Sequence, residues 1–109
     1  IKEGKNPIVF GDGSQVRDFI FVQDVVEANV AVMLSDVKHG FFNIGTGDVV
    51  SIKELASLMI KISGKSLQIE YDKPLDGDIK LSKADMSLAT KTFDWRPQTT
   101  LEQGLRDLF

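Results

Sequence analysis

Residues 11–25, with the sequence GDGSQVRDFIFVQDV, constrain the fold of this chain more than any other stretch. Two glycines bracket Asp12, a composition that lets the backbone turn sharply through dihedral angles that other residues resist. A turn is therefore expected after a short apolar strand over residues 7–10. The apolar run at residues 19–22 is too short for a helix and predicts a small buried strand.

Arg17 is the one cation of this segment, and it lies at the mouth of the predicted strand. A guanidinium held there by a rigid element presents a planar fork of donors, the geometry that suits phosphate oxygens. The alternative is a surface ion pair with Asp18 or Asp12, an interaction that is common and contributes little to stability. Residue types alone favour the surface pair.

Two helices are expected from the periodicity and the capping residues. From residue 24 the apolar spacing becomes helical, which predicts a helix over residues 24–35 with Asp24 as its N-cap. Ser51 and Glu54 have the spacing of a capping box and predict a second helix, which Gly64 ends.

The rest of the chain continues the alternation of strands and helices. The remaining predicted elements are strands over residues 41–44 and 67–71, a short helix started by Ser82, and a last helix capped by Thr99 or Thr100. Trp95 is expected to be a core aromatic between those last helices. A chain of 109 residues, 42% hydrophobic and 27% charged, has room for one modest core. We therefore expect a single α/β domain over residues 1–109, too small for a complete doubly wound sheet.

Composition argues against several classes of protein. A formal net charge of -3 without a basic cluster is not that of a nucleic-acid-binding protein. The absence of cysteine excludes disulfides and thiol catalysis. No apolar run approaches the ~20 residues that span a bilayer, so no membrane partner is expected and the cytoplasm is the expected location. The chain begins at Ile1 instead of methionine, which indicates a fragment.

No catalytic, cofactor or metal motif is complete. The glycine turn at residues 45–47 has Val50 where a dinucleotide-binding loop needs its third glycine. The Gly-Lys-Ser at residues 64–66 follows a helix instead of opening one, so it is not a P-loop. His39, the only histidine, lies in a predicted loop, so the sequence shows no nucleophile paired with a histidine base. The spacing of the carboxylates does not indicate a metal site.

Six short segments occur in a characteristic order along nearly the whole chain. They are residues 11–25, FNIGTG at 42–47, SIKEL at 51–55, GDI at 77–79, ADMS at 84–87 and DWRPQTTLEQGL at 94–105. In this order they resemble extended short-chain dehydrogenase/reductases that act on nucleotide sugars, the family of UDP-glucose 4-epimerases and dTDP-glucose 4,6-dehydratases. The resemblance implies a small alternating strand/helix C-terminal lobe that binds substrate and lacks most of the Rossmann domain.

The resemblance also implies a cofactor and a ligand. NAD is expected in the full-length protein, on an N-terminal dinucleotide-binding domain that is missing here, and none is expected on this fragment. The ligand is a UDP- or dTDP-hexose, gripped by its nucleotide diphosphate. No catalytic residue is implied, because Tyr71, the only tyrosine, has Pro74 where the family's lysine stands.

Six substrate-binding residues follow from the resemblance. They are Ile8 and Phe10 beside the base, Arg17 on the diphosphate, Phe19 at a neighbouring aromatic position, Ile52 touching the nucleotide, and Asp78 near the base and ribose. Their chemistry suits these roles, because a diphosphate needs fixed donors and a ribose diol needs an acceptor.

One departure from the family pattern leaves the substrate open. Many relatives carry a second diphosphate-binding arginine two residues before the glycine of the Gly-Asp pair, where this chain has Leu75. Lys73 is a candidate to supply that charge, without a bidentate fork. The expected function is that of an epimerase like UDP-glucose 4-epimerase. The alternatives are a related 4,6-dehydratase or decarboxylase, and a non-catalytic binding module that keeps the fold.

Association is also expected from the sequence. A lobe separated from its partner domain exposes apolar surface, and Phe41, Phe42 and Ile44 are the expected contributors if their strand normally extends another sheet. We therefore expect self-association.

Overall fold

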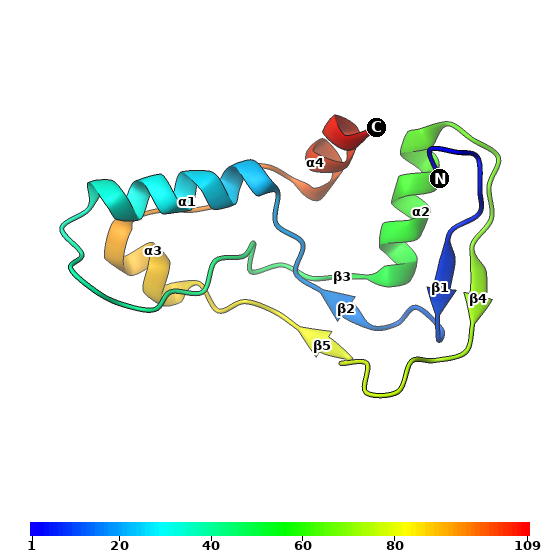
Figure 1. Cartoon of the computed structure of the whole chain (residues 1–109), viewed down its shortest axis with the longest axis horizontal. Helices are drawn as coiled ribbons and strands as arrows, with labels where there is room; N and C mark the ends of the chain where they lie inside the picture. Colours follow the sequence, from blue (N-terminus) through cyan, green and yellow to red (C-terminus); the bar gives the residue numbers. More distant parts are fainter.

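The computed structural model describes all residues of the chain, 1–109. It has an elongated shape of 50 × 30 × 17 Å, in which short strands and helices are mixed along the chain, so the expected α/β class is confirmed (Figure 1). The elements in chain order are β1 (Ile8–Phe10), β2 (Val16–Arg17), α1 (Val22–Leu34), β3 (Val50–Ser51), α2 (Ile52–Ser63), β4 (Glu70–Asp72), β5 (Leu81–Ser82), α3 (Ser87–Phe93) and α4 (Leu101–Leu108). None of the helices is both long enough and apolar enough to cross a membrane.

One end of the molecule is built on a parallel strand pair. β1 and β4 run side by side in the same direction, with Val9 opposite Tyr71 (Figure 1). α2 contacts β1 and also contacts α4, and the three elements bury Val9, Ala56 and Leu105 between them. This small core holds β1 against α2, and β1 in turn pairs with β4.

The middle of the molecule is a three-stranded sheet with β2 in the centre. β2 pairs antiparallel with β3 and parallel with β5, so Arg17 lies opposite Val50 on one side and Ser82 on the other. Both flanking strands therefore hold the backbone of Arg17.

α1 and α3 lie at the opposite end from β1 and β4 (Figure 1). The predicted helix over residues 24–35 is present as α1, but it begins two residues earlier, with Phe21 at the N-cap. The expectation that Asp24 caps this helix is therefore wrong. Asp24 is almost fully buried, and its carboxylate accepts from the backbone N–H groups of Gln98 and Thr99 at 2.9 and 3.1 Å.

Two predicted strands and one predicted helix start are also wrong. Residues 19–22 and 41–44 have no strand partner in this chain, and a strand forms only where a second strand supplies its hydrogen bonds. Ser82 does not start a helix. It belongs to β5, and α3 begins only at Ser87.

The predictions that rest on local capping chemistry are confirmed. Ser51 and Glu54 form the capping box of α2, and Gly64 ends this helix in the left-handed conformation with φ 65°. Thr100 caps α4, where its hydroxyl accepts from the N–H of Gln103. Trp95 is buried as expected.

Candidate functional site

A cleft of about 840 Å³ opens where β1 and β4 end. Because these strands are parallel, Phe10 and Asp72 meet at one edge, and the N–H of Gly11 donates to the carbonyl of Asp72 at 2.9 Å. The carboxyl ends of parallel strands are where open α/β sheets usually bind ligands. The cleft is lined by Phe10, Gly11, Asp12, Ser14, Gln15, Lys53, Tyr71, Asp72, Pro74, Leu75, Asp78 and Lys80.

The predicted glycine turn forms one wall of this cleft. Gly13 has φ +74°, and a Cβ there would lie 2.9 Å from Cβ of Lys53, so glycine is required for the turn to pack on α2. Asp12 accepts from the N–H and the hydroxyl of Ser14 at 2.9 and 2.6 Å. These hydrogen bonds lower the pKa of Asp12.

Arg17 pairs with Asp78, and neither Asp12 nor Asp18 is its partner. Nη2 of Arg17 lies 2.5 Å from Oδ1 of Asp78, and Nη1 donates to the carbonyl of Val16 at 2.8 Å. Gln15 holds the other oxygen of Asp78, because its Nε2 donates to Oδ2 at 3.1 Å and to the carbonyl of Phe10 at 3.0 Å. The guanidinium is thus fixed at the edge of the cleft.

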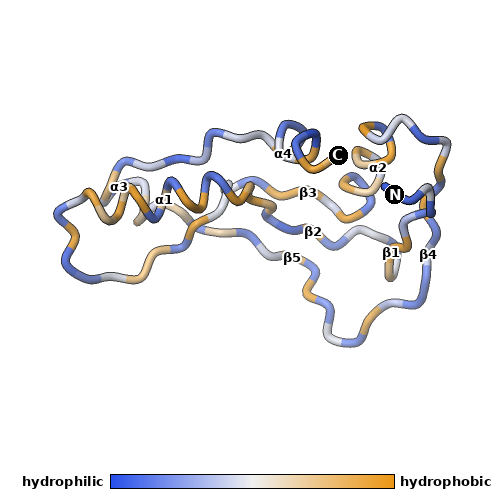
Figure 2. The backbone as a smooth tube through the Cα atoms, turned by 45° about the horizontal axis from the view of Figure 1, so that its top comes forward, coloured by the Kyte–Doolittle hydropathy of each residue, from blue (hydrophilic) through white to orange (hydrophobic).

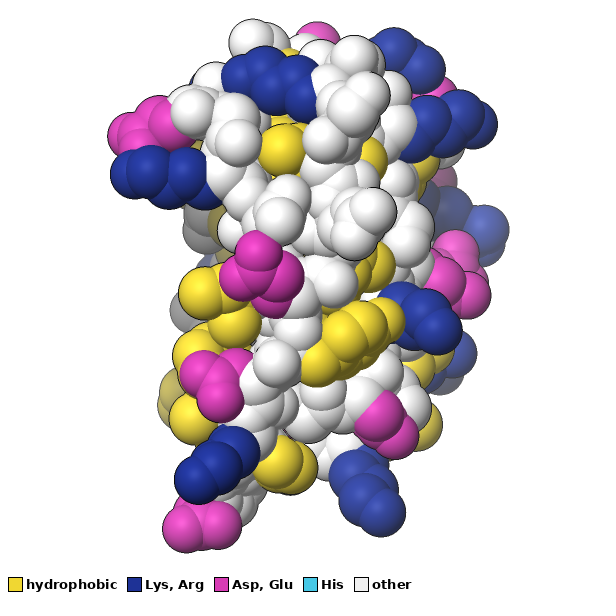
Figure 3. Space-filling model, turned by 90° about the vertical axis from the view of Figure 1, so that its right-hand side faces the viewer, with side chains coloured by type: hydrophobic (Ala, Val, Ile, Leu, Met, Phe, Trp, Pro, Cys, Tyr) yellow, Lys and Arg dark blue, Asp and Glu magenta, His cyan; other side chains and the backbone are white.

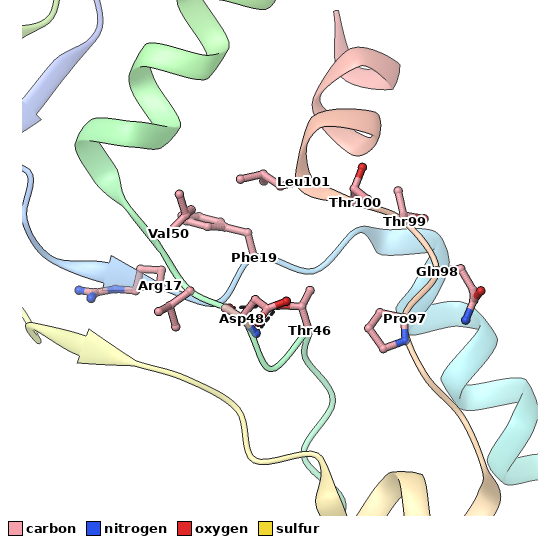
Figure 4. Close-up of a pocket in the computed structure, with 11 residues that line it drawn as sticks. Arg17, Phe19, Thr46, Asp48, Val50, Pro97, Gln98, Thr99, Thr100 and Leu101 are labelled. Atoms are coloured by element: carbon pink, nitrogen blue, oxygen red, sulfur yellow. Dashed lines mark hydrogen bonds between the residues drawn. The ribbon is translucent and has the colours of Figure 1, made fainter.

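A smaller pocket of about 310 Å³ lies where β2, β3 and the segment before α4 meet (Figure 4). It is lined by Arg17, Phe19, Thr46, Asp48, Val49, Val50 and residues 97–101. Figure 4 shows the guanidinium nitrogens of Arg17 turned away from Pro97 and Gln98. The charged end of Arg17 is therefore directed away from residues 97–98 and is bonded to Asp78, which lines the larger cleft.

The structure brings together some of the predicted site residues. Phe10 and Asp78 line the larger cleft, Arg17 is bonded to Asp78, and Phe19 shares the smaller pocket with Arg17. Ile8 and Ile52 line neither cavity. Ile8 is exposed on β1 two residues before Phe10, and its side chain is on the same face. Ile52 is half-buried at the start of α2, where its N–H donates to Gln15 at 3.0 Å.

The sequence analysis missed Gln15, Lys53 and Lys80. Gln15 could have been identified from the sequence, because it precedes Arg17 by two residues and side chains two residues apart in an extended segment lie on the same face. The two lysines had none, since Lys53 and Lys80 come from segments that meet the turn only in the folded chain.

Asp18 is a structural anchor that the sequence analysis also missed. Its carboxylate accepts from the N–H groups of Thr46, Gly47 and Ala84 at 2.8, 2.9 and 3.3 Å, and from the hydroxyl of Thr46. Burial raises the pKa of Asp18, but these hydrogen bonds outweigh it, so the pKa lies below its ordinary value. Asp18 thereby ties together three distant segments.

The same contacts show that the glycine turn at residues 45–47 does not fit a dinucleotide phosphate. Its N–H groups, which would cradle an anion, are already taken by the Asp18 carboxylate. A Cβ at Gly45 would lie 2.5 Å from Cβ of Ala84 and 2.7 Å from Oδ2 of Asp18, so the turn is filled by the chain itself.

Charges are mixed around the end of the molecule that carries β1 and β4. Figure 3 shows basic and acidic side chains interspersed with hydrophobic ones over this end. The face therefore has no broad patch of one sign. An anion at this end would therefore meet individual cations and not a broad basic surface.

The chain matches the model of a known family and is similar to several named proteins. The family model described as GDP-mannose 4,6 dehydratase matches residues 1–108. The putative UDP-glucose 4-epimerase of Methanocaldococcus jannaschii is 36% identical over 104 residues, which are 95% of this chain and 33% of the relative. UDP-glucuronic acid decarboxylase 1 of Arabidopsis thaliana is 36% identical over 102 residues, with 93% and 23% covered.

Solved structures have the same fold. UDP-glucose 4-epimerase from Thermotoga maritima, crystallised with UDP-glucose, superposes with a TM-score of 0.89 at 36% identity, over 96% of this chain and 34% of that one. A mutant UDP-glucuronic acid 4-epimerase from Bacillus cereus, in complex with a fluorinated UDP-sugar and NAD, gives 0.86 at 34% identity, with 95% and 34% covered. This chain spans between 23% and 34% of the length of these proteins.

Proposed function

The chain belongs to the GDP-mannose 4,6 dehydratase family, and we propose that it is the part of an NAD-dependent nucleotide-sugar epimerase that grips the nucleotide diphosphate. A related dehydratase or decarboxylase is the second candidate, favoured by the family's description and by the Arabidopsis relative. The chemistry on the sugar is assigned to parts of such an enzyme that this chain does not contain.

The observation that carries the proposal is the arrangement of Gln15, Arg17 and Asp78 at the end of two parallel strands. Arg17 uses one N–H on Val16 and one on Asp78, which leaves other donors of its five for phosphate oxygens. Each oxygen of Asp78 accepts one hydrogen bond from the protein and has a lone pair left for a ribose hydroxyl. A guanidinium beside a carboxylate suits a ribose linked to a diphosphate.

Apolar residues flank this arrangement. We propose that Phe10 and Ile8, exposed on the same face of β1, lie against the base. Phe19, which lines the smaller pocket with Arg17, is proposed to pack beside that arginine. Ile52, whose N–H donates to the carbonyl of Gln15, is proposed to contact the nucleotide. UDP-sugars are the proposed substrate class, in line with the ligands of the structural neighbours.

NAD is proposed for the complete enzyme and not for the residues of this chain. The turn at residues 45–47, the one with a dinucleotide-like sequence, is filled by Asp18 and Ala84 and does not fit the cofactor's phosphates. No step of the reaction is assigned to residues described here. Their role is to bind and orient the nucleotide.

The test of the proposal is calorimetric titration of UDP and dTDP into the wild-type protein and the Arg17→Lys variant. Lysine keeps the charge but loses the planar fork, so the affinity for either diphosphate is expected to fall about tenfold or more. Arg106→Lys is the matched control, because Arg106 pairs with Glu102 on α4, outside the cleft. Equal diphosphate affinities in all three proteins would remove the residue-level support for the proposal.

A further inference from the structure

Two lysines in the larger cleft have no carboxylate partner. The ion pairs of the chain are Lys5 with Glu3, Arg17 with Asp78, and Arg106 with Glu102. Lys53 and Lys80 line the cleft and take part in none of them. Their charges are therefore the free cations of the cleft.

The backbone of each lysine is held firmly against the turn that carries Gln15 and Arg17. The N–H of Lys53 donates to the carbonyl of Gly13 at 3.0 Å, and its Cβ packs against that glycine. The carbonyl of Lys80 accepts from the N–H of Val16 at 2.9 Å, which places Lys80 beside β2 just before β5 begins. Two elements distant in sequence thus bring a lysine to the same cleft.

The local electrostatics give these lysines no structural role. Lys53 lies in the first turn of α2, where the helix dipole disfavours a cation, and the carboxylate of Glu54 is committed to the N–H and hydroxyl of Ser51. The pKa of Asp12 is lowered mainly by its hydrogen bonds from Ser14, and the charge of Lys80 is a lesser cause. Neither lysine is needed to hold a carboxylate in place.

Arg17 alone leaves the charge of a diphosphate unbalanced. The carboxylate of Asp78 already compensates the guanidinium, so the pair is neutral as a unit. A diphosphate that binds there brings two or more negative charges, which need cations that are not already paired. Leu75, which also lines the cleft, has no charge to offer.

We propose that Lys53 and Lys80 form the second cationic contact for the substrate's diphosphate, beside the paired guanidinium of Arg17. This inference rests on the proposed function and names the residues that complete its phosphate site. Lys73, which the sequence suggested for this task, does not line the cleft. Its backbone N–H instead donates to the Asp72 carboxylate at 2.7 Å.

The experiment compares Lys53→Gln, Lys80→Gln and their double variant with Lys73→Gln, the matched control on an exposed lysine. Binding of UDP, UMP and uridine is measured by calorimetry, and circular dichroism verifies the fold of each variant. Each single change in the cleft is expected to weaken UDP binding about threefold to fivefold, the double change about tenfold or more, and Lys73→Gln not at all. Uridine affinity is expected to stay constant throughout. The salt dependence of UDP binding is expected to flatten in the double variant, because fewer charge contacts remain to be screened.

The outcomes separate the inference from the function on which it rests. If the cleft variants bind UDP as well as Lys73→Gln does, while Arg17→Lys still binds it weakly, the lysine contact is refuted and the nucleotide site stands. A uridine affinity that falls as much as the UDP affinity refutes the inference as well, because the lysines then act on the nucleoside. Failure of wild type to bind UDP overturns both proposals.

Discussion

Nη2 of Arg17 donates to Oδ1 of Asp78 at 2.5 Å, and this contact joins residues 61 positions apart in the chain. The side chains are 25% and 32% exposed, so the pair is neither fully solvated nor fully buried. A pair with this exposure contributes roughly 1 kcal/mol or less to stability. Its larger effect is to fix the guanidinium at the edge of the cleft, where it is proposed to meet the diphosphate.

Replacing Asp78 by asparagine tests whether the carboxylate belongs to the ligand site. Asparagine removes the charge that fixes Arg17 and weakens the acceptor proposed for ribose. We expect the affinities for UDP and for uridine both to fall about threefold to tenfold, the loss of one hydrogen bond's contribution, while the thermal midpoint changes little. Titration calorimetry and thermal melts measure the two effects.

Asp76→Asn is the control for charge alone. Asp76 lies two residues before Asp78 in the same loop, does not line the cleft, and forms no ion pair. If only the loss of a negative charge mattered, both variants would bind UDP more tightly than wild type, because the ligand is an anion. That result would contradict the proposed role of Asp78.

Capping boxes and glycine stops could be predicted from the sequence because their chemistry is complete within a few residues. Ser51 with Glu54 and Gly64 with its positive φ are such cases. The strand expected at residues 41–44 needed a partner that the sequence does not display. The pair of Arg17 with Asp78 was missed for the same reason, although each residue was proposed separately for the site.

The hydrogen bonds to the Asp18 carboxylate predict that the folded protein loses stability in acid. Its pKa is lowered below the ordinary value of 3.8, because hydrogen bonds from Thr46, Gly47 and Ala84 favour the ionised form. The folded state binds this proton less readily than the unfolded state, so the stabilisation is fully present above about pH 4 and is lost as pH falls through the folded pKa. Urea unfolding at a series of pH values from 6 downwards measures the free energy of unfolding and therefore this loss.

Asp18→Asn is expected to lower the free energy of unfolding at pH 7 by roughly 1–2 kcal/mol and to flatten its decline in acid. Asp48→Asn is the matched control, since Asp48 is exposed in the loop whose N–H groups bind Asp18, and its side chain forms no ion pair. An acid profile of Asp18→Asn that parallels the wild-type profile would show that other carboxylates control the transition.

The exposed apolar surface differs from the one expected. Of the three residues predicted to contribute, only Phe41 is fully exposed, because Phe42 packs edge to face on Phe93 with ring centroids 5.2 Å apart and Ile44 is half-buried. The larger surface is on α1, where Figure 2 shows hydrophobic residues recurring along the helix. The exposed apolar residues of this stripe are Val22, Val26, Val30 and Met33.

Because of the apolar stripe on α1, we predict that the chain associates with itself when nothing else covers this helix. Spacings of four, four and three residues put the four side chains on one helical face, and a continuous apolar face of this kind favours contact with another surface. We expect the weight-average mass measured by sedimentation equilibrium to rise with concentration, and Val30→Glu to reduce that rise. Gln23→Glu adds the same charge to the same helix outside the stripe and is expected to associate like wild type. A wild-type chain that stays monomeric at high concentration, or a Gln23→Glu variant that dissociates as readily as Val30→Glu, would show that the stripe does not drive association.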